Sequence, residues 1–147
     1  MGESQATLTR ASGPRLPVLV YAFLWLAAIV TPIYWVVYFA TGNLTPSPTD
    51  VGQRFELAFP AADMWMAIAA GLGAIGLQRG ARWGRPMAIA AGSAMFYLAL
   101  MDITFDLENG VYFLVRGQVI VEMIINATCV IGSLYLLYEL IVRAPRT

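Results

Sequence analysis

Four long apolar stretches, each almost free of charge, constrain this chain more than any other feature of its sequence. They cover about residues 17–40, 57–77, 86–105 and 117–138. An α-helix rises about 1.5 Å per residue, so stretches of this length match a hydrocarbon layer about 30 Å thick. Hydrophobic residues make up 59% of the 147-residue chain and charged residues only 12%, which is too few to cover a soluble fold. The sequence therefore predicts an all-α membrane protein, a single bundle of four transmembrane helices.

Polar segments flank and separate these stretches. Residues 1–16 are predicted to form a flexible tail and residues 141–147 a second, short tail. The segment Thr41–Glu56 is rich in Gly, Pro, Asn and Ser, which is typical of a loop. Residues 78–85 predict a short basic turn, and residues 106–110 a tight acidic turn.

The arginines predict the orientation of the bundle. Seven of them flank one side, at positions Arg10, Arg15, Arg79, Arg82, Arg85, Arg143 and Arg146. Only Arg54 and Arg116 flank the other side. Because basic residues near span ends stay in the cytoplasm, both termini are predicted to be cytoplasmic. We expect a multi-pass protein of a bacterial or archaeal plasma membrane.

Several residue types are missing, and their absence excludes several kinds of chemistry. The chain has no histidine, which is the commonest metal ligand and the commonest general base near neutral pH. It also has no lysine, and its one cysteine, Cys129, cannot form an intrachain disulfide. We therefore expect no cofactor, no metal site and no catalytic residue. The basic turn is short and is explained by topology and lipid contact, so we expect no nucleic-acid partner.

One glycine motif is explained by packing. Residues 71–76 fit the dinucleotide-binding pattern G-x-G-x-x-G, but they lie inside an apolar span and follow no strand. Small residues instead let helix backbones approach each other. We expect this role for Gly73, Gly76 and Gly80, and equally for Ala88 and Gly92.

Polar residues repeat at helical spacing along the third and fourth spans. Asp102, Asp106 and Asn109 share one helix face, and so does the longer series Gln118, Glu122, Asn126, Cys129 and Ser133. Polar stripes on membrane helices face the bundle interior, since lipid cannot solvate them. The two spans are joined by a tight turn and must be antiparallel neighbours, so their stripes can face each other.

These stripes predict a polar pocket in the outer half of the bundle. Its predicted lining is Asp63, Asp102, Asp106, Asn109, Arg116, Gln118, Glu122 and Asn126. Arg116 and Arg54 are the available counter-charges, and Arg116 could pair with Asp102 or Asp106 across helices. Each acid also has a purely structural explanation: Asp63, for example, could complement a helix dipole, and the other acids could lie at the water interface.

Three classes of function remain open at this point. The pocket could bind or transport a cation, a proton or an amine-bearing amphipathic molecule, and four helices are few for a complete carrier, so transport would require a dimer. The chain could instead be a non-catalytic subunit of a larger membrane complex, with membrane lipid as its other partner. The third possibility is a lipid- or sterol-modifying enzyme that uses paired carboxylates.

Overall fold

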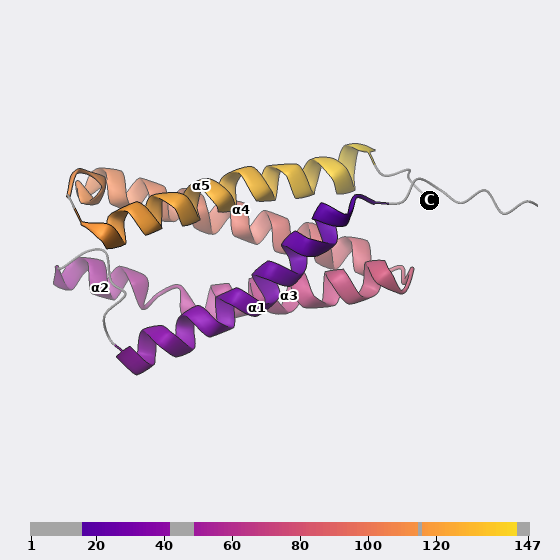
Figure 1. Ribbon diagram of the computed structural model, residues 1–147, viewed down its shortest axis with the longest axis horizontal. Coiled ribbons are helices and arrows are strands. Elements are labelled where there is room, and N and C mark those ends of the chain that lie inside the picture. Colours follow the sequence, from indigo (N-terminus) through magenta and orange to yellow (C-terminus); the bar gives the residue numbers. More distant parts are fainter. Residues whose placement is uncertain (1–15, 42–48, 115, 144–147) are drawn as a thin grey trace, which may run out of the picture.

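Four long helices make up the fold, as the sequence predicts. The computed structural model describes residues 16–41, 49–114 and 116–143. Its long helices are α1 (Val18–Thr41), α3 (Pro60–Gln78), α4 (Gly84–Glu108) and α5 (Gly117–Leu137), and each belongs to a segment long and apolar enough to cross a membrane. The described residues form no strand. Figure 1 shows the α4–α5 pair lying alongside the α1–α3 pair.

The predicted loop Thr41–Glu56 is wrong over its last part. The structure forms a short helix there, α2 (Asp50–Glu56), and residues 42–48 lie outside the described residues. The Thr49 side chain caps this helix by accepting a 3.1 Å hydrogen bond from the Gly52 amide. The Phe55 ring stacks on Phe105 of α4, with the ring centroids 3.9 Å apart. This tertiary packing stabilises a helix in a segment whose local composition favours turns.

The predicted acidic turn at residues 106–110 is also partly wrong. Helix α4 continues through Asp106 to Glu108, and the chain turns only at Gly110, which has a φ of +67°. Glycine adopts this left-handed conformation without steric cost, and the 3₁₀ turn η1 (Val111–Phe113) follows it. Asp106 therefore faces the same helix side as Asp102, one turn away.

Small residues bring α3 and α4 into direct backbone contact. A Cβ atom at Gly73 would lie 2.7 Å from the Ala88 nitrogen, and one at Gly76 would overlap the backbone of Gly84. At Gly92 a Cβ atom would lie 3.2 Å from the Leu136 side chain of α5, so this glycine meets a side chain and not a backbone. The backbone contact predicted for Gly73, Gly76 and Ala88 is thus confirmed.

Gly80 has a different role from the predicted one. No atom lies within 4 Å of the position a Cβ would take there, and its φ is +64°. It ends α3: the Ala81 amide donates to the Gly76 carbonyl at 2.8 Å, and the Gly80 amide donates to the Leu77 carbonyl at 3.2 Å. This is a Schellman motif, in which glycine supplies the left-handed residue.

The arginine end of the bundle, where α3 ends and α4 begins, is tied together by polar bonds. Helix α5 continues into the π-helical segment η2 (Tyr138–Arg143), beyond the predicted span end at residue 138. The Arg85 Nε atom of α4 donates a 2.9 Å hydrogen bond to the Leu140 carbonyl. Arg143 pairs with the buried Glu139 at 3.0 Å. Residues 1–15 and 144–147 of the predicted tails lie outside the described residues.

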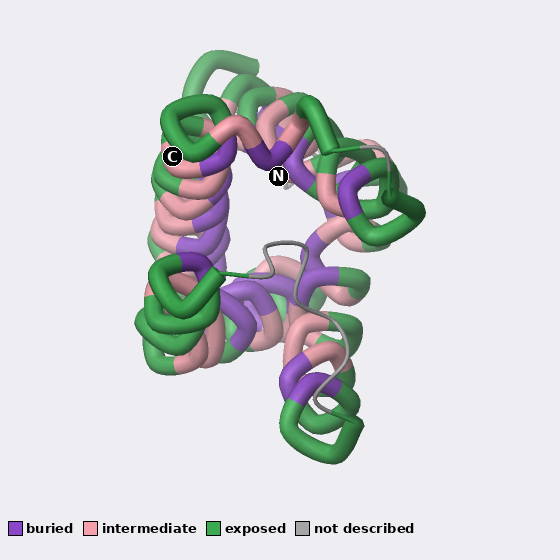
Figure 2. Tube along the Cα trace, turned by 90° about the vertical axis from the view of Figure 1, so that its left-hand side faces the viewer, coloured by how far each residue is buried: buried purple, intermediate pink, exposed green. Residues whose placement is uncertain are grey.

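The core is built from small side chains, and the outside is apolar. Leu24 of α1, Ala70 of α3, Ala91 of α4 and Leu136 of α5 are fully buried in one cluster. Figure 2 shows the buried positions facing the middle of the bundle and the exposed positions facing outward. Many exposed positions are large and apolar, such as Ile33 and Ile131, which is the surface expected of helices that contact lipid.

Candidate functional site: an acidic cavity between the helices

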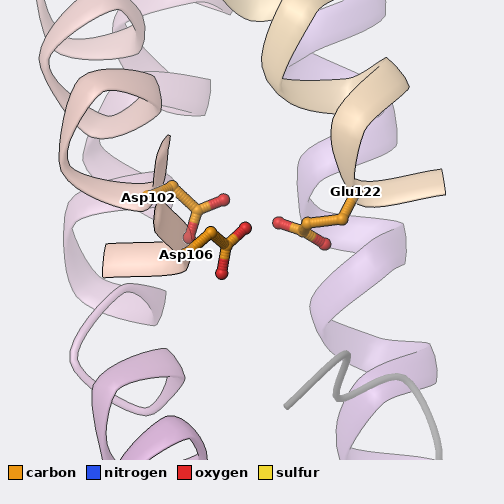
Figure 3. A group of neighbouring side chains, drawn as sticks. All are labelled: Asp102, Asp106 and Glu122. Carbon is orange, nitrogen blue, oxygen red and sulfur yellow. The ribbon is translucent and has the colours of Figure 1, made fainter. Parts of the chain in front are cut away.

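Three carboxyl groups meet between α4 and α5. Asp102 and Asp106 come from α4 and Glu122 from α5, and one oxygen of each lies within 4.8 Å of the others. Figure 3 shows the three side chains pointing toward one another across the space between the two helices. The two predicted polar stripes therefore do face each other at these positions.

Asp106 is the most enclosed member of this carboxyl cluster, which we define as Asp102, Asp106 and Glu122. Its exposed fraction is 3%. Within the described residues its Oδ2 atom is buried and has no hydrogen-bond partner. A buried polar atom without a partner is costly in a low-dielectric interior. The cluster is therefore a place where a ligand atom or a proton would be stabilised.

Tyr112 links the carboxyl cluster to Asn126. The Asn126 Nδ2 group donates a 3.0 Å hydrogen bond to the Tyr112 hydroxyl oxygen, and the Tyr112 hydroxyl in turn hydrogen-bonds to Asp106. Burial raises the pKa of Tyr112 to about 12, and the neighbouring charges of Asp106 and Asp102 act in the same direction. Tyr112 therefore stays a neutral donor, which positions one side of Asp106.

Asp63 reaches the same region from α3. It lies in the first turn of that helix and accepts a 2.9 Å hydrogen bond from the Trp35 indole nitrogen of α1. Glu56, at the end of α2, also lies on the wall of the cavity described next. The acidic end of the bundle, opposite the arginine end, thus gathers carboxyl groups from α2, α3, α4 and α5.

A cavity of about 330 Å³ joins Asp102 and Glu122 to Asp63 and Glu56, whereas Asp106 of the carboxyl cluster is not part of its wall. It lies between all four long helices, and its wall is mostly apolar away from the carboxyl groups. The wall includes Phe23, Leu26, Ala27, Val30, Thr31, Tyr34, Trp35, Glu56, Phe59, Asp63, Met66, Met95, Leu98, Ala99, Asp102, Glu122, Ile124, Ile125, Asn126, Thr128 and Cys129. Small-molecule sites have this character, with apolar walls and a few convergent polar groups.

Some of the predicted pocket residues lie elsewhere. The Asn109 side chain is exposed and donates a 2.8 Å hydrogen bond to the Phe105 carbonyl of its own helix. Gln118 and Arg116 are exposed and do not contribute to the cavity wall. In the described part of the chain, no ion pair joins Arg116 or Arg54 to the carboxyl cluster. Among the arginines that the structure describes, none forms an ion pair with the carboxyl cluster.

Sequence reasoning missed several residues of the site. Trp35 and Tyr112 were not among the predicted pocket residues, yet Trp35 bonds to Asp63 and Tyr112 bonds to Asn126. Glu56 was placed at the end of a loop. The sequence does contain a helix-start pattern before Glu56, because Thr49 can cap a helix and Asp50 follows it in the first turn. That pattern predicts a helix that would include Glu56.

The carboxyl cluster offers the oxygen atoms that hard cations such as Ca²⁺ prefer, one from each residue. Its apolar surroundings suit an organic cation as well.

Comparison with known proteins adds no functional assignment to this geometry: no protein-family model, no curated protein and no solved structure matches the chain.

Proposed function

We propose that this chain is a small integral membrane protein that binds a positively charged ligand in its acidic cavity. The observation that carries the proposal is the carboxyl cluster, in which one oxygen of each residue lies within 4.8 Å of the others and no arginine of the described ranges forms an ion pair with them. Two charged carboxylates about 4 Å apart repel by about 4 kcal/mol at an effective dielectric constant of about 20. A cation, or protons that exchange with it, removes this repulsion.

The shape of the cavity favours an amine-bearing amphipathic molecule among the possible cations. An inorganic ion would use only the carboxyl oxygens. The apolar wall contributed by Phe23, Met66 and Met95 would add nothing to its binding. An alkyl amine would use both parts, because its ammonium group pairs with Asp102 and Glu122 while its tail is removed from polar surroundings.

The biological role we propose for this binding is reception or transport in a multi-pass protein of a bacterial or archaeal plasma membrane. Arginines at positions 79, 82, 85 and 143 gather at one end of the bundle. The positive-inside rule then directs the acidic end outward. Transport by four helices would require a homodimer or a larger membrane complex.

A role as a non-catalytic membrane subunit is compatible with the same fold. Small residues on the bundle surface would have favoured contacts with partner helices, but Gly73 and Gly76 contact α4 and Gly92 contacts α5 inside the bundle.

A lipid- or sterol-modifying enzyme is the second candidate. It is favoured by Asp102 and Glu122, whose carboxyl groups lie within hydrogen-bonding reach and face an apolar cavity.

Amine binding to two double variants tests the proposal. Asp102→Asn/Glu122→Gln neutralises the cavity with side chains of the same shape. Asp50→Asn/Glu108→Gln removes the same charge from exposed acids that do not line the cavity. Labelled dodecylamine would be titrated against each variant in lipid nanodiscs, with dodecanol as the uncharged probe.

We expect the cavity variant to bind dodecylamine about tenfold more weakly or worse, because it loses charge-assisted bonds worth about 1.5–3 kcal/mol. The control variant should bind as the wild type does, and dodecanol should not distinguish the variants. Equal dodecylamine affinity in all three proteins would refute the proposal. Turnover of an added lipid that depends on Asp102 and Glu122 would favour the enzyme instead.

A further inference from the structure

One side of the cavity lies open between α1 and α5. Five residues of its wall are at the same time exposed on the outside of the bundle: Leu26 and Val30 of α1, and Ile124, Ile125 and Thr128 of α5. Exposed fractions of 50% for Val30 and 61% for Ile124 are too large for a closed wall. The cavity therefore reaches the surface along the seam between these two helices.

The course of the two helices explains the opening. Helix α1 packs along α3 and contacts α5 only sparsely. The contact lies toward the arginine end, where the Phe23 ring occupies the space that a side chain at Gly132 would need. Toward the acidic end α1 and α5 diverge (Figure 1). The opening is thus a wedge whose closed end is at Phe23.

The surface around this wedge is apolar. Ile33 of α1, and Ile120 and Val121 of α5, are exposed large apolar residues on the helices that form its sides. In a bilayer such surfaces contact hydrocarbon. In a bilayer the wedge therefore opens toward lipid.

A second hollow extends the seam beyond Phe23. It has a volume of about 380 Å³ and is lined by Leu19, Ala22, Phe23, Leu26 and Tyr135. Phe23 and Leu26 line both hollows, so the two meet at these side chains. From Glu122 to Gly132 the chain of α5 rises about 15 Å. A dodecyl chain attached to a group at Glu122 has the length to reach Phe23.

We propose that the ligand is a long-chain amine dissolved in the bilayer, and that it enters sideways between α1 and α5. Its ammonium group pairs with Asp102 and Glu122, and its hydrocarbon tail lies along the cavity toward Phe23. Asp106, buried and with an unpartnered Oδ2, lies beside this pair but outside the cavity wall, with one oxygen within 4.8 Å of an oxygen of each. This inference rests on the proposed function, which it deepens by fixing the class of ligand and its route.

Bulky substitutions at the rim test the route, and the chain offers closely matched controls. Val30→Trp/Ile124→Trp fills the wedge from both sides. Ile29→Trp/Met123→Trp places the same indoles on the same two helices, at residues that do not line the cavity and that lie about 100° around each helix from the test residues. Their exposed fractions are 52% and 48%, against 50% and 61% for the test pair. Association of labelled dodecylamine would be followed in lipid nanodiscs, with butylamine as the probe without a long tail.

The expected result is that Val30→Trp/Ile124→Trp slows dodecylamine association by about tenfold or more, because binding then requires the helices to move. The control pair should associate at the wild-type rate. Butylamine should compete with dodecylamine at least tenfold more weakly, because a short chain leaves most of the apolar wall uncovered. Should the double rim variant lose its helical circular dichroism, the single variants Val30→Trp and Ile124→Trp answer the same question.

Unchanged dodecylamine association in the rim variants would overturn the lateral route. Equal competition by butylamine would overturn the role of the tail. In both cases amine binding that still depends on Asp102 and Glu122 would leave the proposed function standing. If neither amine binds the wild type, the proposed function fails and this inference fails with it.

Discussion

The Trp35 indole nitrogen of α1 donates a 2.9 Å hydrogen bond to the Asp63 carboxylate of α3. Both side chains lie on the wall of the acidic cavity, and Trp35 is buried. The Trp35 ring also meets Tyr38 edge to face at 5.1 Å. Because α1 contacts α5 so little, this polar bond to α3 is one of the features that hold α1 in place.

Removal of the Trp35 donor should weaken the attachment of α1. In Trp35→Phe the aromatic ring stays and the N–H group is lost. Interhelical hydrogen bonds in membrane proteins contribute about 0.6 kcal/mol on average and about 1.7 kcal/mol at most. We expect the free energy of unfolding to decrease by an amount within this range. The decrease would be measured by SDS titration of the protein in mixed micelles. Trp65→Phe, at an exposed position, is the matched control, and an equal loss in both variants would contradict the role of the bond.

The contact between Gly76 and Gly84 should not tolerate a methyl group. In Gly76→Ala the new Cβ would overlap the α4 backbone and would lie 2.7 Å from the Trp83 ring. Because backbone cannot move aside as a side chain can, we expect a loss of about 1–3 kcal/mol in the free energy of unfolding. The control is Gly117→Ala, where no atom lies within 4 Å of the added methyl. A Gly76→Ala protein as stable as that control would show that the helices are less closely packed.

Tyr112 should make stability depend on pH in the alkaline range. Its pKa is raised to about 12 by burial, above the ordinary value of 10.0. The folded state therefore holds the phenol proton more tightly than the unfolded state does. Its contribution to stability is complete below pH 10 and is lost as the pH rises toward 12. The thermal unfolding temperature of the wild type should fall across this pH window more steeply than that of Tyr112→Phe. Parallel curves of unfolding temperature against pH would count against the raised pKa of Tyr112.

The arginine distribution makes a prediction about sidedness that cysteine labelling can check. In a Cys129→Ala background, Arg82→Cys and Glu108→Cys place single exposed thiols at opposite ends of the bundle. A membrane-impermeant maleimide should label Glu108→Cys in intact cells, and Arg82→Cys only after permeabilisation. The opposite result would direct the carboxyl cluster toward the cytoplasm.

The helical spans were predictable because a single physical requirement fixes them. A stretch such as Val18–Thr41 has no other environment that suits its uncharged, apolar surface, and Pro32 does not end the helix. Helix ends depend on individual contacts and were less predictable. Helix α4 ends at Glu108, three residues beyond the predicted span end at residue 105, and Gly110 supplies the left-handed residue of the turn that follows. The stacking of Phe55 on Phe105 joins residues far apart in sequence, and no local pattern announces it.

The site was predictable where helical periodicity determines it. Asp102 with Asp106, and Glu122 with Asn126, are each one turn apart, so each pair follows from spacing alone. The bond from Trp35 to Asp63 required the relative rotation of α1 and α3, which composition does not encode. Asn109 lies on the same helix face as Asp102 by its spacing in the sequence. It stands just after the end of α4, however, and its side chain bonds to the Phe105 carbonyl of that helix. Periodicity gives the face of a side chain, and only the tertiary structure gives its depth.

The bond from Arg85 to the Leu140 carbonyl has a consequence for the mechanics of the whole bundle. It lies at the same end as the backbone contact between Gly76 and Gly84. These contacts join α3, α4 and the end of α5, and they do not include α1. A displacement of α1 that admits a guest molecule would therefore leave this joint intact and would act instead on the contacts between α1 and α3, among them the hydrogen bond from Trp35 to Asp63.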